Sequence, residues 1–353
     1  MRREIRKGRR RARRHLRRHG FAIGRGWTAF FVLLLLAFGL AALLDARRER
    51  ADIADLMAYA RERRTDPAAL ITSAARTNRL LFLSDIHRSA LPKRIAADAI
   101  EALAHGPGLD AVVLEVGSDQ QPFIDAYLSS DPENIAILYV HPRTLHAQWG
   151  VDRAVLEIYR RVWRLNRELG PGREIRIVAA DLPGWPPDRR LSPGEAARRF
   201  AQRDAHMEQI IEDRILATNP WARVLIFMGG FHGLKGSRAT IRFGGGPPVE
   251  VTWLVTRLAE NHPGEVYSIM LDAGSVPVPD GSIAVYRSTR LFDLFRRNLP
   301  DVVGPFALTV NDRFDFLPDP ILSTAVPGLD LAVRPEGYHL KDVIDGYIFL
   351  GVR

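Results

Sequence analysis

Imidazole and carboxylate side chains lie within a few residues after four short apolar runs of the sequence. The sets are Ser84-Asp85-Ile86-His87 after residues 80–83, Glu115 after residues 111–114, Asp181 after residues 175–179, and Gly229-Gly230-Phe231-His232 after residues 224–228. Enzymes use these side chains as general acids and bases, and the same side chains bind divalent metal ions. If the four runs are parallel strands of one sheet, their carboxyl ends meet at one edge of it. The sequence therefore predicts a single site at that edge.

Two histidines are the candidates for a catalytic base in this site. We expect His87 or His232 to act as a general base on water, while Asp85 and Glu115 orient the imidazoles or bind a divalent ion. The candidate metal ligands are therefore Asp85, His87, Glu115 and His232. The sequence has no Cys, and a ligand set of histidines and carboxylates without a thiolate suits Zn²⁺ or Mn²⁺.

An arginine on a well-marked helix completes the catalytic candidates. Ser192-Pro193-Gly194-Glu195 has the form of a capping box with proline at the first helical position, so a helix is expected from there to Thr218. Arg203 lies on the apolar side of this helix, where a buried guanidinium needs a carboxylate partner such as Glu115 or Asp85. It would hold Glu115 or stabilise an oxyanion. Alternatively, Arg203 lies at the edge of the apolar face and reaches solvent.

Three more polar residues are expected to support the site: Asp181, Asp204 and His206. Each acidic residue taken alone has a structural explanation, because an Asp or Glu after a strand often caps a helix or closes a turn. Their gathering at one sheet edge is what favours a functional interpretation.

The elements that would position these side chains alternate between strands and helices. Strands are expected at residues 80–83, 111–114, 135–140, 175–179, 224–228, 249–254, 266–271 and 347–350. Helices are expected at residues 92–104, 151–169 and 192–218. Short apolar runs that alternate with amphipathic stretches are typical of βαβ units. The sequence therefore predicts an α/β fold with a mainly parallel central sheet and helices on both faces.

The segments outside these elements have less regular patterns. Residues 45–77 are expected to form a stalk helix or linker with few long-range contacts, and residues 78–353 the α/β domain. Within that domain we expect a proline-rich loop at 182–190, a tight turn at 244–248 and an irregular elaboration at 272–345.

The amino terminus carries nearly all of the excess positive charge. Residues 1–26 contain 12 of the 50 Lys and Arg residues and one of the 41 acidic residues. Residues 27–353 therefore have 38 basic and 40 acidic residues, a net charge of −2. Residues 27–353, with this net charge, offer no positive field that would bind nucleic acid.

The run 27–44 is expected to be a membrane anchor. It has eighteen residues and no charge, which is enough to cross a bilayer as a helix. Basic residues stay on the cytoplasmic side, so the domain is expected in the periplasm, anchored to the cytoplasmic membrane by residues 27–44.

A cleaved signal peptide is the alternative for the same segment. Its apolar region is usually shorter, and no small-residue cleavage site precedes Asp45. Arg17 and Arg18 followed by Phe21 resemble a twin-arginine signal, although the spacing differs. Either alternative leads to the same compartment.

The ordered set of motifs resembles the superfamily of erythromycin esterase-like proteins, ChaN-type haem-binding lipoproteins and TraB/Tiki proteins. The family pattern is Gly-Glu-x-His after one strand, Glu after a second, Arg-Asp-x-x-Met on a helix and Gly-x-x-His after a later strand. Here these are residues 84–87, Glu115, residues 203–207 and residues 229–232, with Ser84 and Asp85 in place of Gly and Glu. The resemblance covers about residues 78–352. It implies a hydrolase acting on a small molecule or peptide, some members being metal-dependent, or alternatively a haem carrier.

The calcineurin-like metallophosphoesterases also begin with a strand followed by Asp-x-His. That family then needs Gly-Asp-x-x-Asp and Asn-His-Asp or Asn-His-Glu around two metals. This chain has Glu115-Val116-Gly117-Ser118-Asp119 at the first position, and its Asn261-His262 pair is followed by Pro263. The phosphoesterase is thus the less favoured alternative.

Overall fold

A computed structural model of the chain describes residues 2–87, 89–140, 152–187, 191–236, 238–243, 246–273, 285–286, 290–317, 324–325, 329–334 and 339–351. The chain divides into two compact units, residues 1–55 and residues 56–353. We call the second the α/β unit.

The first unit consists of the amino-terminal part of helix α1 (Arg2–Arg63). Large apolar side chains along it are exposed, among them Phe30, Leu33, Leu36 and Leu40. Among the residues whose side chains are described, no helix is long and apolar enough to cross a membrane. The membrane span expected at residues 27–44 therefore stays a prediction.

The core of the α/β unit is a seven-stranded sheet with the order β3-β2-β4-β1-β7-β12-β9. The strands are β1 (Leu80–Asp85), β2 (Ala111–Gly117), β3 (Arg176–Asp181), β4 (Val224–Gly229), β7 (Val266–Asp272), β9 (Phe306–Thr309) and β12 (Gly346–Phe349). All neighbours pair in parallel except β9, which is antiparallel to β12. The prediction of a mainly parallel sheet is confirmed.

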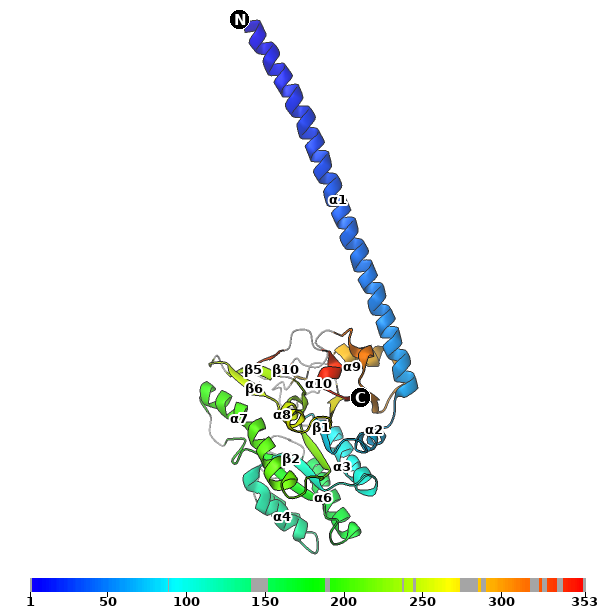
Figure 1. Cartoon of the computed structure of the whole chain (residues 1–353), viewed down its shortest axis with the longest axis vertical. Coiled ribbons are helices and arrows are strands. Elements are labelled where there is room, and N and C mark those ends of the chain that lie inside the picture. Colours follow the sequence, from blue (N-terminus) through cyan, green and yellow to red (C-terminus); the bar gives the residue numbers. More distant parts are fainter. Residues whose placement is uncertain are drawn as a thin grey trace. The chain divides into compact units, whose positions relative to one another are not determined.

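Helices cover both faces of this sheet, as expected (Figure 1). One face packs against α2 (Pro67–Ala74), α3 (Ala90–His105), α4 (Gln121–Ser129) and α6 (Asp152–Leu169), the other against α7 (Pro193–Ile211) and α8 (Leu254–Asn261). Alternate residues of each strand point to opposite faces, so Leu81 and Leu83 contribute to the first layer and Leu80 and Phe82 to the second. Burial on both faces explains why these strands are continuous apolar runs.

The capped helix begins where the sequence predicts. Ser192 is the N-cap of α7, and its hydroxyl accepts a hydrogen bond from the backbone N–H of Glu195 at 3.4 Å. The helix ends in a π-helical turn, Glu212–Leu216, close to the expected end. This start matters for function because it fixes the rotation of α7 and hence the direction of Arg203.

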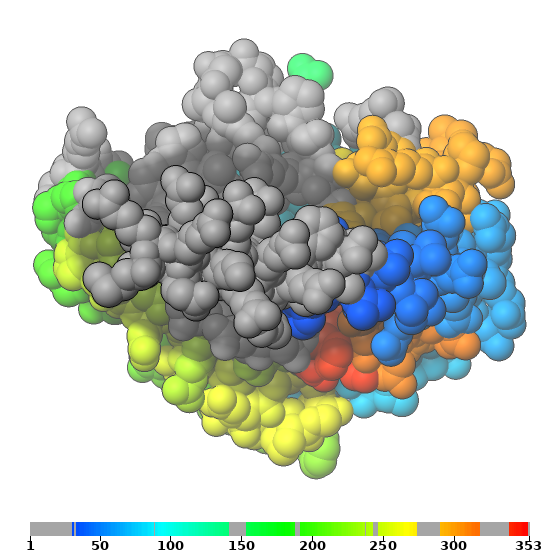
Figure 2. Space-filling view, turned by 90° about the horizontal axis from the view of Figure 1, so that it is seen from above, coloured from blue at the N-terminus to red at the C-terminus, as the bar shows by residue number. Residues whose placement is uncertain are grey.

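The other elements surround this core. A three-stranded sheet has the order β11-β5-β6, from β5 (Arg238–Phe243), β6 (Val249–Thr252) and β11 (Leu329–Arg334). The short elements are α5 (Ala136–Tyr139), α9 (Arg290–Asn298), α10 (Leu340–Val343), β8 (Val285–Tyr286), β10 (Thr324–Ala325) and the 3₁₀ turns Ser118–Gln120, Gly230–Gly233 and Asp312–Phe314. Seen from above, the green to yellow-green residues of α7 and β5 and the orange residues of α9 lie on opposite sides of the visible face (Figure 2).

Two expectations from the sequence are wrong. Residues 135–140 contain the helix α5 instead of a strand, and only Leu138 of α5 is buried. Part of the segment expected to be a stalk with few long-range contacts is packed, because Leu56 and Ala60 are fully buried. The strand expected at residues 249–254 is present as β6, although it ends at Thr252 and belongs to the smaller sheet.

Two further expectations fall partly outside the described residues. Residues 188–190 of the proline-rich loop and residues 244–245 of the tight turn are not described. In the segment 272–345, the described strand β9 joins the main sheet beside β12, so this segment contributes to the core.

Candidate active site

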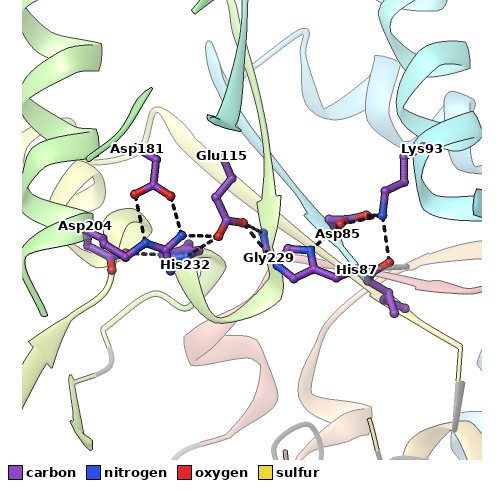
Figure 3. Close-up of polar contacts among 10 residues, drawn as sticks. Asp85, His87, Lys93, Glu115, Asp181, Asp204, Gly229 and His232 are labelled. Carbon is purple, nitrogen blue, oxygen red and sulfur yellow. Dashed lines mark hydrogen bonds and ion pairs between the residues drawn. The ribbon is translucent and has the colours of Figure 1, made fainter. Parts of the chain in front are cut away.

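The polar residues at the carboxyl ends of the parallel strands lie in mutual contact (Figure 3). Asp85 ends β1, Glu115 lies near the end of β2, and Asp181 ends β3. The turn after β4 carries His232. Because β1, β2, β3 and β4 are parallel neighbours, their ends deliver these side chains to one sheet edge, as the sequence analysis expected.

A buried arginine lies between two of the carboxylates. The Arg203 Nε atom donates to Asp181 Oδ1 at 3.0 Å, and Nη2 donates to Asp181 Oδ2 at 2.7 Å and to Glu115 Oε1. Burial on its own would raise the pKa of Glu115, but Arg203, His87 and His232 hold it well below its usual value. Glu115 is therefore an ionised carboxylate although it is buried.

His232 is held on both sides by carboxylates. Its Nδ1 atom lies 2.7 Å from Asp204 Oδ1, its Nε2 atom lies 3.6 Å from Glu115 Oε1, and the residue is only 4% exposed. Burial on its own would lower the pKa of His232, but Asp204 and Glu115 raise it to about 10. An imidazole that is already protonated at neutral pH cannot accept a proton from water. His232 is therefore a poor candidate for the base.

The stability of the α/β unit is expected to fall between neutral and alkaline pH because of His232. Histidine has a pKa of about 6.5 in an unfolded chain, whereas the pKa of His232 is about 10 in the folded chain. Protonated His232 thus stabilises the fold fully below about pH 6.5, and this contribution is lost as the pH rises toward about 10. Urea unfolding across this range should show the slope in the wild type, a flatter slope in His232→Gln, and an unchanged slope in the control His105→Gln. Parallel curves for wild type and His232→Gln would contradict the imidazolium.

His87 is placed differently from His232. Its Nδ1 atom lies 2.8 Å from Oδ2 of the buried Asp85, its Nε2 atom lies 3.7 Å from Glu115 Oε2, and its side chain is 27% exposed. The distance to Glu115 is too long for a direct hydrogen bond. Of the two candidate bases, His87 is thus the one that a water molecule or substrate can reach.

The sequence analysis missed one charged residue of this site, Lys93. Its Nζ atom lies 2.7 and 2.8 Å from the two oxygens of Asp85 and donates to the Ile86 carbonyl at 3.1 Å, and the side chain is fully buried. Burial lowers the pKa of Lys93, and Asp85 opposes that effect. The signal was present in the sequence, because Lys93 precedes Ala97 by four residues and Ile100 by seven, on the apolar face of α3.

The expected supporting residues have distinct positions. Asp204 positions His232 and also accepts from the Leu254 backbone N–H at 2.7 Å. His206 lies beside the cluster, with Nε2 3.2 Å from the Ser118 hydroxyl, and burial lowers its pKa. Of the two partners expected for Arg203, it binds Glu115, while Asp85 pairs with Lys93.

Gly229, the last residue of β4, lies close to two side chains of the site. Its backbone N–H donates to Glu115 Oε2 at 2.8 Å, so the strand end also orients this carboxylate. A Cβ atom there would lie 3.2 Å from the same oxygen and 3.4 Å from the His87 ring. Glycine therefore allows β4, Glu115 and His87 to approach one another.

The candidate metal ligands do not fit a divalent ion in the arrangement described. Asp85 is bound by Lys93 and Glu115 by Arg203, so each carboxylate already faces a buried cation that would repel a metal ion. Among the described residues, no group of three or more His, Asp or Glu could hold a metal ion. Binding of Zn²⁺ or Mn²⁺ by Asp85, His87, Glu115 and His232 therefore stays a prediction, which elemental analysis would test.

Comparison with known proteins identifies the fold. No protein-family model and no curated protein matches the sequence. A solved structure of the erythromycin esterase EreC, a mutant in its open conformation, matches with a TM-score of 0.50 and 12% identity over 80% of this chain and 92% of its own. A succinoglycan biosynthesis protein matches with a TM-score of 0.54 and 9% identity over 84% and 96%. A protein from Bacillus cereus matches with a TM-score of 0.50 and 11% identity over 84% and 97%.

These similarities confirm, at the level of the fold, the resemblance to erythromycin esterase-like proteins noted from the motifs. Identities of 9 to 12% carry no activity from one protein to another. The chemistry of this chain has to be argued from its own site.

Proposed function

We propose that the α/β unit is a hydrolase in which His87 is the general base that activates water. The observation that supports this most directly is the pairing of a partly exposed imidazole with a buried carboxylate, His87 Nδ1 to Asp85 Oδ2 at 2.8 Å. Such a carboxylate keeps the proton on Nδ1 and leaves Nε2 as the basic atom.

The attacking water would lie between His87 and Glu115. Their facing atoms, Nε2 and Oε2, are 3.7 Å apart, and one water can bridge two groups that are too far apart to bond directly. Water attacks the carbonyl carbon while its proton passes to Nε2 of His87, and the resulting imidazolium returns that proton to the leaving group. Glu115, kept ionised by Arg203 and His232, stabilises the transient positive charge on His87.

The charge of the site favours an uncharged substrate such as a carboxylic ester or amide. The site has one more carboxylate than it has cations. The carboxylates are those of Asp85, Glu115, Asp181 and Asp204, and the cations are Lys93, Arg203 and protonated His232. This set has no excess positive charge to bind a phosphate group. The esterase named among the structural neighbours makes esters, including macrolactones, the first class to test.

A substrate panel tests this proposal. The full chain in detergent would be assayed on carboxylic esters, a macrolactone, peptide amides and phosphate monoesters, with elemental analysis of the same preparation. Hydrolysis of an ester or amide is expected. Turnover of phosphate esters alone, together with two equivalents of bound metal, would instead support the metallophosphoesterase alternative.

A haem-binding protein without turnover is the second outcome of the same panel. His87 is the partly exposed imidazole that could ligate a haem iron. A Soret band on addition of haem, lost in His87→Ala and accompanied by no hydrolysis, would favour that alternative over the hydrolase.

We further propose that residues 27–44 anchor the chain in the cytoplasmic membrane with the α/β unit in the periplasm. The eighteen-residue uncharged run and the twelve basic residues before it support this. The full chain is expected to stay in the membrane fraction after an alkaline carbonate wash, whereas a chain lacking residues 27–44 should be released. Protease added to spheroplasts should degrade the α/β unit, and protection equal to that of a cytoplasmic control protein would contradict this orientation.

A further inference from the structure

Lys93 lies under the proposed base, in a position that packing alone does not explain. Its side chain is fully buried in α3, among the apolar residues that pack on the sheet. A buried ammonium group is costly unless a carboxylate meets it, and an apolar side chain of the same length would fill the space at no such cost. The charge therefore calls for a functional explanation.

The contacts of Lys93 lead directly to the base. Asp85 Oδ2 accepts from Lys93 Nζ at 2.8 Å and faces His87 Nδ1 at 2.8 Å (Figure 3). A third contact, from Nζ to the Ile86 carbonyl at 3.1 Å, ties the ammonium group to the backbone between Asp85 and His87. One carboxylate oxygen is thus shared by the ammonium and imidazole groups.

We propose that Lys93 is a positioning residue that orients the Asp85 carboxylate toward His87, so that His87 holds its proton on Nδ1. Without the Lys93 ammonium group, Asp85 Oδ2 would no longer be held against His87 Nδ1. The imidazole would then lose the acceptor for its Nδ1 proton and would carry that proton on Nε2. In that tautomer Nε2 already carries a proton and cannot accept one from water. His87 would then still be present but could not act as the base.

This inference rests on the proposed function, and one experiment separates the two. Lys93→Met keeps the length of the side chain and removes the charge. Nitrogen-15 NMR of histidine-labelled full chain in detergent reports which ring nitrogen of His87 carries the proton, with the signals assigned by their absence in His87→Asn. This measurement needs no substrate, so it tests the effect of Lys93 on the His87 tautomer even if the substrate panel shows no hydrolysis.

The expected result is a shift of the His87 proton from Nδ1 to Nε2 in Lys93→Met. With a hydrolysed substrate, kcat should fall by about 10- to 100-fold with KM unchanged, as for other partners of catalytic groups. The control Lys235→Met removes an ammonium group from the ion pair with Asp345 and should leave both the tautomer and kcat as in the wild type. An unchanged His87 tautomer in folded Lys93→Met would overturn the proposal.

A second variant covers the case in which Lys93→Met does not fold. The double variant Lys93→Met with Asp85→Asn removes both buried charges and is expected to fold, because a neutral pair replaces the ion pair. Its kcat should stay low, since asparagine replaces the carboxylate that faces His87 Nδ1. Wild-type kcat in this double variant would show that His87 needs neither member of the Lys93–Asp85 pair, and it would contradict a positioning role for Lys93.

Discussion

Replacing His87 by asparagine is expected to lower kcat for ester or amide hydrolysis by about 10²- to 10⁴-fold, the usual contribution of a general base. Asparagine keeps an N–H group that can donate to Asp85, but it has no basic nitrogen at the position of Nε2. The side chain is partly exposed, so its loss removes little packing. The midpoint of thermal unfolding should therefore change by only a few degrees.

The matched control for this variant is His105→Asn. His105 is the last residue of α3, and its side chain is 44% exposed. It should keep the wild-type kcat and the same thermal midpoint. An active His87→Asn variant, or one that loses activity only because it unfolds, would remove His87 from the proposed mechanism.

Replacing Arg203 by methionine is expected to have the largest effect on stability. The guanidinium group belongs to a residue that is 3% exposed, and it forms ion pairs with both Glu115 and Asp181. Its removal leaves two buried carboxylates without their cation, and breaking a buried ion pair in this way costs ~3–5 kcal/mol of the free energy of unfolding. Urea unfolding measures this loss directly.

Two further variants test the cause of that loss. Arg199→Met removes a partly exposed guanidinium group from the same helix. That group donates to the Pro183 carbonyl, and its loss should change stability by less than ~0.5 kcal/mol. Adding Glu115→Gln and Asp181→Asn to Arg203→Met removes the uncompensated charges and should restore most of the lost stability. A triple variant no more stable than Arg203→Met would show that the carboxylates are not the reason.

The central strands and the site edge could be predicted because burial on both faces makes a parallel strand a continuous apolar run. Residues 80–83 and 224–228 are such runs, and the polar residues after them mark the carboxyl ends of β1 and β4. The side of α7 that carries Arg203 followed from the helical period and a clear N-cap. These signals are local, and a sequence displays them directly.

What the sequence did not reveal depends on contacts between distant segments or on ambiguous local patterns. The apolar run 135–140 is too short for periodicity to separate a strand from a helix, and it forms α5. The pairing of β9 with β12, such as Ala307 with Ile348, has no local signature. The choice between His87 and His232 required the positions of Asp204 and Glu115 around His232.

Lys93 was missed although its signal was local. The helical-wheel argument that identified Arg203 on α7 applies equally to Lys93 on α3, because both place a cation on a buried face. A capping box fixes the start of the helix that carries Arg203, whereas the N-cap Ser89 of α3 makes no side-chain cap hydrogen bond. In both helices, a charged residue on the apolar face marks a buried ion pair of the site.

The source of oxygen in the product tests the central claim most directly. A single turnover would be run in ¹⁸O-labelled water with enzyme in excess over an ester that the panel identifies, and the carboxylic acid product analysed by mass spectrometry. If His87 activates water for direct attack, the first turnover incorporates one ¹⁸O atom into the product and none into the protein. Unlabelled product, with ¹⁸O appearing later on Asp85 or Glu115, would mean that a carboxylate attacks the substrate, and it would contradict the mechanism.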